Sequence, residues 1–163
     1  MTNVLFVCLG NICRSPLAQA LMEKKIKEKG LTSEIHVDSC GTSQYHIGES
    51  PDKRTLQNAA DNGLKIEHKA RQFSKKDFRD FDYIVAMDSA NLECVRRMDQ
   101  TNEFDHKLLI MRDYDEVNPG ADVPDPYFGG SEGFQHVYQM LDRSVEAFLE
   151  KIIQEKNLHE LKS

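Results

Sequence analysis

The chain has 163 residues and a formal net charge of −6, with 39% hydrophobic and 29% charged residues. This length and balance predict one globular domain over residues 1–163 and exclude a disordered chain. A nucleic-acid-binding protein would need a basic surface, which the negative charge argues against. The first residues lack the basic start and long apolar run of a signal peptide, and no window approaches the ~20 apolar residues of a membrane span. We therefore expect a cytoplasmic monomer without membrane or nucleic-acid partners.

Apolar runs and amphipathic stretches alternate along the chain. Continuous apolar runs are typical of strands covered on both faces, and apolar stripes at i, i+3, i+4 are typical of helices. The pattern predicts strands at 3–9, 34–39, 81–87 and 106–111, and helices at 16–30, 53–63, 89–98 and 131–156. Ser15 is expected to cap the first helix and Gly30 to end it.

This alternation predicts an α/β fold, a single-domain three-layer sandwich. We expect four parallel strands in the order 2-1-3-4, with helices on both faces. Ligands of such folds bind beyond the carboxyl ends of the strands, where the first strand ends at Cys8. Residues 111–130 leave the fourth strand at the same edge and are rich in Pro, Gly and Asp. A connection of about 20 residues is long enough to favour a functional role.

The stretch that follows Cys8 has the parts of an oxyanion site. Gly10 and Asn11 tolerate left-handed backbone angles, so the loop can turn its N–H groups inward. The following helix adds the positive end of its dipole, and Arg14 offers a fork that matches two phosphate oxygens. Such a field favours a thiolate, so Cys8 is interpreted as a nucleophile rather than a packed core residue. The expected phosphate-binding loop comprises Leu9, Gly10, Asn11, Ile12, Cys13, Arg14 and Ser15.

The remaining cysteines and the histidines predict neither a metal site nor a cofactor. The cysteines show no CxxC pair or zinc-type spacing, and the six histidines form no i, i+4 pair. Cys40 and Cys94 are interpreted as packing residues.

If the bound oxyanion is a phosphate ester with a poor leaving group, its cleavage also requires a proton donor. The loop at 111–130 offers four carboxyl groups for this role, those of Asp113, Asp115, Asp122 and Asp125. Composition does not choose among them. The prolines on both sides of Asp125 would restrict its backbone, which favours that residue.

The chain resembles the low-molecular-weight protein tyrosine phosphatase family in "VCLGNICRSP", "VDSCGTS", "HKARQFSKKDF", "FDYIVAMDSANL" and "DPYFGG", which span nearly its whole length. The resemblance implies a metal-independent, two-step hydrolysis of phosphotyrosine or small aryl phosphates. Cys8 would form a phosphocysteine, Arg14 would clamp the phosphoryl oxygens, and Asp125 would act as general acid and then base. Inorganic phosphate or vanadate would inhibit.

The resemblance also implies supporting roles. Ser15 would steady the thiolate, and Asn11 would hold the loop through hydrogen bonds that reach Ser39 and His68. Cys13 would be a redox partner that forms a reversible disulfide with the nucleophile. The aromatic rim around the substrate would consist of Tyr45, Tyr127 and Phe128.

Two alternatives stay open. A thioredoxin-coupled arsenate reductase of the same fold uses a similar cradle, but it needs a later pair of resolving cysteines, and Cys40 and Cys94 lie far apart. The other alternative is a module that binds phosphate without catalysis.

Overall fold

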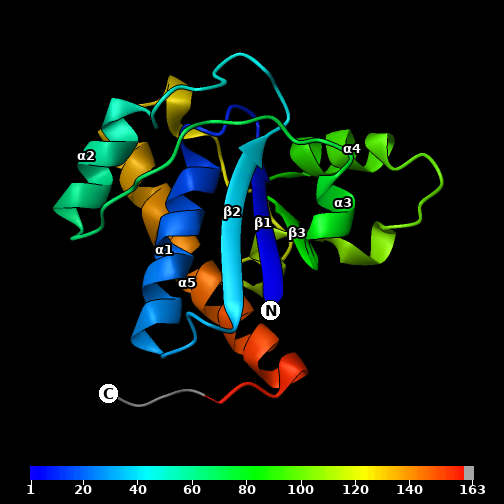
Figure 1. Cartoon of the computed structure of the whole chain (residues 1–163). Helices are drawn as coiled ribbons and strands as arrows, with labels where there is room; N and C mark the ends of the chain where they lie inside the picture. Colours follow the sequence, from blue (N-terminus) through cyan, green and yellow to red (C-terminus); the bar gives the residue numbers. More distant parts are fainter. Residues whose placement is uncertain (160–163) are drawn as a thin grey trace.

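The computed structural model of the chain describes residues 1–159, apart from the side chains of Phe128 and Ser131. Four parallel strands form one sheet in the order β2-β1-β3-β4. They are β1 (Thr2–Cys8), β2 (Ile35–Gly41), β3 (Tyr83–Ala86) and β4 (Leu108–Ile110). One face carries α1 (Arg14–Glu28), α2 (Lys53–Asp61) and α5 (Ser131–Lys156); the other carries α3 (Asp77–Asp80) and α4 (Ser89–Met98) (Figure 1). The predicted sandwich and strand order are confirmed.

The central strand β1 is buried on both faces. Val4 and Phe6 pack into the core shared with α1 and α5, where Phe6 meets Phe148 edge-on at 6.3 Å between ring centroids. Leu5 and Val7 pack into a second core on the α3 and α4 face. This double burial explains the continuous apolar run of the sequence. It also fixes Cys8 at the carboxyl end of a central strand.

The first helix differs from the prediction at its start. It begins at Arg14, and the residue at its N-cap position, Cys13, makes no side-chain capping bond. The expectation that Ser15 caps the helix is therefore wrong, because its hydroxyl is used by the neighbouring loop. Gly30 does follow the end of the helix in a left-handed conformation, with φ +71°.

The fourth strand is shorter than predicted. Asp105–Lys107 form a 3-10 turn rather than the start of β4. In this turn, the Nζ of Lys107 donates to the carbonyls of Phe78 and Phe81 at 2.8 and 2.9 Å. The loop at 111–130 contains two further 3-10 turns, at Met111–Tyr114 and Pro126–Phe128. Within the described residues, no helix is long and apolar enough to cross a bilayer.

Candidate active site

A tight loop joins β1 to α1 and wraps around the sulfur of Cys8. Asn11 lies in the left-handed region with φ +58°, and this turn aims its backbone N–H at Cys8 Sγ, 3.3 Å away. Ser15 Oγ lies 3.0 Å from the same sulfur. A thiolate can only accept hydrogen bonds, so an ionised Cys8 receives one from each group.

The residues that follow β2 hold this loop through backbone hydrogen bonds. The backbone N–H of Thr42 donates to the Cys8 carbonyl, and that of Ser43 to the Leu9 carbonyl, both at 2.9 Å. Gly41 is needed at this point, because a Cβ there would stand 2.7 Å from the Leu9 carbonyl oxygen. A glycine at the end of the strand thus lets the loop pass close to β2.

The side chain of Asn11 is the hub of a buried network. Its Nδ2 donates to Ser15 Oγ at 2.8 Å and to Ser39 Oγ at 3.0 Å. Its Oδ1 accepts from the Arg71 N–H at 3.0 Å and lies 2.7 Å from His68 Nε2. An amide oxygen can only accept hydrogen bonds, so His68 Nε2 must carry the proton of this bond. The structure thus brings together Asn11, Ser39 and His68, as the resemblance implied.

His68 is half-buried, and its burial lowers the pKa of the imidazole below the ordinary value of 6.5. The neutral ring with its proton on Nε2 is therefore favoured. Ser39 extends the network, since its hydroxyl lies 3.2 Å from His68 Nε2 and donates to Gln19 on α1 at 2.7 Å. The network ties α1, β2 and the 63–73 segment to the loop around the sulfur.

Arg14 is buried and lies between two carboxylates. Its guanidinium pairs with Asp88, donates to the Val123 carbonyl at 3.0 Å, and lies 3.5 Å from Asp125 Oδ2. Burial alone would lower the pKa of Arg14, but the negative charges of Cys8 and Asp88 outweigh it and raise the pKa. The guanidinium is therefore a fixed cation beside the sulfur.

Sequence reasoning missed Asp88. This residue follows β3 and caps α4, where its Oδ1 accepts from the Asn91 N–H at 2.7 Å while its other oxygen holds Arg14. Its position at the carboxyl end of a strand, directly before a helix, was the available signal.

The structure separates the four aspartates of the long loop. Asp115 is buried between Arg112 and Arg143, at 2.9 and 2.8 Å. Asp122 accepts from the Ser89 N–H at 2.8 Å, and Asp113 from the Ile110 N–H at 3.3 Å. Asp125 is the one that lines the pocket of Cys8.

Asp125 is held at that pocket by one local bond. Its Oδ1 accepts from the Tyr127 N–H at 3.0 Å, which leaves Oδ2 facing Arg14. Its side chain is 29% exposed, so the carboxyl reaches both the pocket and water. A carboxyl in this position can exchange protons with either.

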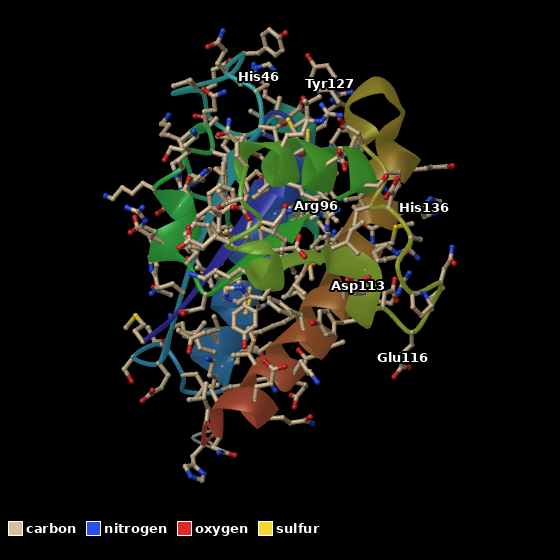
Figure 2. The ribbon with its side chains drawn as sticks, turned by 90° about the vertical axis from the view of Figure 1, so that its right-hand side faces the viewer. His46, Arg96, Asp113, Glu116, Tyr127 and His136 are labelled. Carbon is tan, nitrogen blue, oxygen red and sulfur yellow. The ribbon has the colours of Figure 1, made fainter. Side chains whose placement is uncertain are left out.

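The pocket above the sulfur has a volume of about 270 Å³. It is lined by two groups of residues, the loop residues Cys8, Leu9, Gly10, Ile12, Cys13 and Arg14, and the more distant Ser43, Tyr45, His46, Asp125 and Tyr127. Figure 2 shows His46 and Tyr127 near each other at the top of the molecule, the end toward which β2 points in Figure 1. Ser43 and His46 were not among the sequence candidates. The side chain of Phe128 lies outside the described part of the structure.

The other thiols differ from Cys8 in their surroundings. Cys13 also lines the pocket, and burial raises the pKa of its thiol to about 12. Cys40 is fully buried in the α3 and α4 core, which also raises its pKa. Within residues 1–159, no three His, Cys, Asp or Glu side chains are grouped to hold a metal ion.

Comparison with known proteins identifies this arrangement. Residues 3–158 match the family described as low molecular weight phosphotyrosine protein phosphatase. The protein of that name from Schizosaccharomyces pombe is 43% identical over 151 residues, covering 92% of this chain and 96% of the relative.

Two solved structures have the same fold. A protein tyrosine phosphatase from Entamoeba histolytica superposes with a TM-score of 0.89 at 38% identity, covering 97% of this chain and all of that one. A Drosophila protein described as an arginine phosphatase superposes at 0.86 with 35% identity, covering 93% and 98%. The chain belongs to the low molecular weight phosphotyrosine protein phosphatase family.

Proposed function

We propose that this phosphatase hydrolyses phosphotyrosine and small aryl phosphates in two steps, through a phosphocysteine on Cys8. The observation that carries the proposal is the meeting of three groups in one pocket. Cys8, Arg14 and Asp125 all line this pocket, and the guanidinium of Arg14 lies 3.5 Å from the carboxylate of Asp125.

In the first step, the Cys8 thiolate attacks phosphorus and the ester P–O bond breaks. The inward N–H groups of the loop and the guanidinium of Arg14 bind the phosphoryl oxygens. Asp125 donates its proton to the departing phenolate oxygen, so the product leaves as a neutral phenol. The substrate replaces the contact between Arg14 and Asp125, since both face the space that the phosphoryl group would occupy.

In the second step, the ionised Asp125 takes a proton from a water molecule. The resulting hydroxide attacks phosphorus, the P–S bond breaks, and Cys8 leaves as a thiolate. The hydroxyl of Ser15, 3.0 Å from the sulfur, donates to that leaving thiolate. Phosphate is the product, and inorganic phosphate and vanadate should compete with substrate for the same loop.

Cys13 serves as a redox partner in this proposal. Hydrogen peroxide would oxidise the Cys8 thiolate to a sulfenic acid. The Cys13 sulfur would then attack the oxidised sulfur, forming a disulfide with loss of water. Both cysteines line the same pocket, which supports this step. A thiol reductant would restore the enzyme.

A leaving-group series tests the proposal. We expect Cys8→Ser to abolish turnover and Asp125→Asn to lower kcat/KM for phosphotyrosine by about 100-fold, within the range of general acid catalysis. Activated esters such as dinitrophenyl phosphate need no proton donor, so their kcat/KM should fall less than about threefold. Asp113→Asn is the matched control, since Asp113 shares the loop but not the pocket.

Three results would contradict the proposal. Equal losses for all esters with Asp125→Asn would remove Asp125 as the acid. Hydrolysis of phosphoarginine in preference to phosphotyrosine would assign the substrate of the Drosophila neighbour instead. Arsenate-dependent oxidation of thioredoxin would favour the reductase, although Cys40 and Cys94 do not line the pocket.

A further inference from the structure

The segment that carries Asp125 is anchored before the acid and is followed by two glycines. Before it, Val123 is buried and its N–H donates to the Met87 carbonyl at 2.8 Å. After it, Gly129 and Gly130 are exposed and lead directly into α5. Two successive glycines allow a wide range of backbone angles. Contacts from outside this turn must therefore hold the segment against the pocket.

Arg54 on α2 provides that contact. Its guanidinium donates to the Tyr127 carbonyl at 2.9 Å and to the Gly129 carbonyl at 3.5 Å. The same group lies over the ring of Tyr127, 5.3 Å from its centroid, and over the ring of Phe134 on α5, at 4.8 Å. One side chain thus contacts both backbone and ring just after the acid, as well as the first turns of α5.

Asp52 fixes the direction of Arg54. Its two carboxylate oxygens accept from Arg54 Nε at 3.1 Å and from a terminal nitrogen at 3.0 Å, the paired geometry that orients a guanidinium. These hydrogen bonds lower the pKa of Asp52, which is therefore ionised at neutral pH. The backbone N–H of Asp52 also donates to the Ile12 carbonyl at 2.8 Å. The start of α2 is thereby tied to the phosphate-binding loop.

We propose that Arg54 is a positioning residue that holds the Asp125 segment over the phosphate-binding loop, with Asp52 joining the two. This inference rests on the proposed role of Asp125 as general acid. Arg54 itself does not line the pocket, so it acts on the reaction through the position of Asp125.

The expected effect is selective. Without the Arg54 contacts, Asp125 would spend less time within reach of the ester oxygen. We expect Arg54→Gln to lower kcat/KM for phosphotyrosine about tenfold, a part of the loss that removal of the acid causes. For dinitrophenyl phosphate, the change should stay below about twofold. Arg54→Lys keeps the charge but not the fork, and should recover only part of the loss.

The experiment is a double-mutant cycle on kcat/KM with both esters. It compares Arg54→Gln, Asp125→Asn and the double variant, with melting temperatures recorded for each. We expect Arg54→Gln to cause no further loss once Asp125→Asn is present. Arg97→Gln is the control, since Arg97 is also exposed but pairs with Glu93 on α4.

The outcomes separate the two proposals. If Asp125→Asn is selective for poor leaving groups and Arg54→Gln is not, the positioning role is refuted and the acid stands. Arg54→Gln losses that persist in the Asp125→Asn background also refute it. Equal losses on both esters with a lower melting temperature would assign Arg54 a structural role alone. If Asp125→Asn is itself unselective, the proposed function fails.

Discussion

Asn11 should be the most sensitive support of the phosphate-binding loop. It is fully buried and makes four side-chain hydrogen bonds, to Ser15, Ser39, His68 and the Arg71 N–H. Each such bond contributes about 1 kcal/mol net, so Asn11→Ala should cost about 4 kcal/mol. The left-handed backbone adds about 1 kcal/mol for alanine. The total is a large fraction of the ~5–15 kcal/mol that stabilises a typical domain.

Asn11→Gly separates the two contributions. Glycine adopts the left-handed conformation without strain, but it makes the unfolded chain more flexible, which offsets part of that gain. We therefore expect the glycine variant to be about as unstable as the alanine variant, within about 1 kcal/mol. A much more stable glycine variant would show that backbone strain, rather than the network, decides.

Urea unfolding and thermal melting measure both variants. At about 3 °C for each kcal/mol in a domain of this size, a loss of ~4–5 kcal/mol lowers the melting temperature by about 12–15 °C. The kcat/KM should fall at least ~100-fold, because the backbone N–H of residue 11 and the Ser15 hydroxyl would no longer be directed at the Cys8 sulfur. A loss below about 1 kcal/mol with activity retained would refute the role of the network.

Three further outcomes are expected. Burial holds the pKa of folded His68 below the unfolded value of 6.5, so the stability that His68 contributes is present above pH 6.5 and is lost as the pH falls below that value. The free energy of unfolding should therefore be lower at pH 5.5 than at pH 7.5, and the difference should be smaller in His68→Gln. With a pKa of about 12, the Cys13 thiol is almost fully protonated at neutral pH. Iodoacetamide should therefore alkylate Cys13 more slowly than Cys8, as followed by mass spectrometry, and equal rates would contradict the raised pKa of Cys13. Asp88→Asn should lower kcat/KM at least ~10-fold because Arg14 loses its partner, whereas Asp122→Asn, which removes another carboxylate at the start of the same helix, should not.

The geometry of the loop that joins β1 to α1 could be predicted because its parts are local. Cys8, Asn11 and Arg14 lie within seven residues, between a strand and a helix whose patterns are clear. Ser15 was recognised as well, but its role as a helix cap was wrong. The site uses its hydroxyl, and this function overrides the capping preference.

The proposed acid could not be chosen from composition, because which aspartate reaches the pocket depends on distant partners. Asp115 is paired with Arg143, which lies 28 residues later in the sequence, and Asp122 with the backbone of Ser89, 33 residues earlier. Only the folded arrangement leaves Asp125 facing the pocket. The resemblance supplied this choice where the local pattern gave only the flanking prolines.

The missed residues share the same cause. Asp88 meets Arg14 across 74 residues of sequence, and Arg54 meets the Tyr127 carbonyl across 73. The position of Asp88 between a strand and a helix marked it as a candidate, but the partner of each residue could not be read from the local sequence. Both pairings depend on how the crossovers bring the start of α4 and the start of α2 to the carboxyl end of the sheet.

The most direct test of the central claim is to trap the intermediate. Enzyme quenched during turnover of p-nitrophenyl phosphate, in the presence of a chelator, is digested and its peptides are analysed by mass spectrometry. We expect a phosphoryl group on the peptide that contains Cys8, undiminished by the chelator and absent from Cys8→Ser. Turnover that survives Cys8→Ser, or a phosphoryl group on any other residue, would contradict the role of Cys8 as the nucleophile.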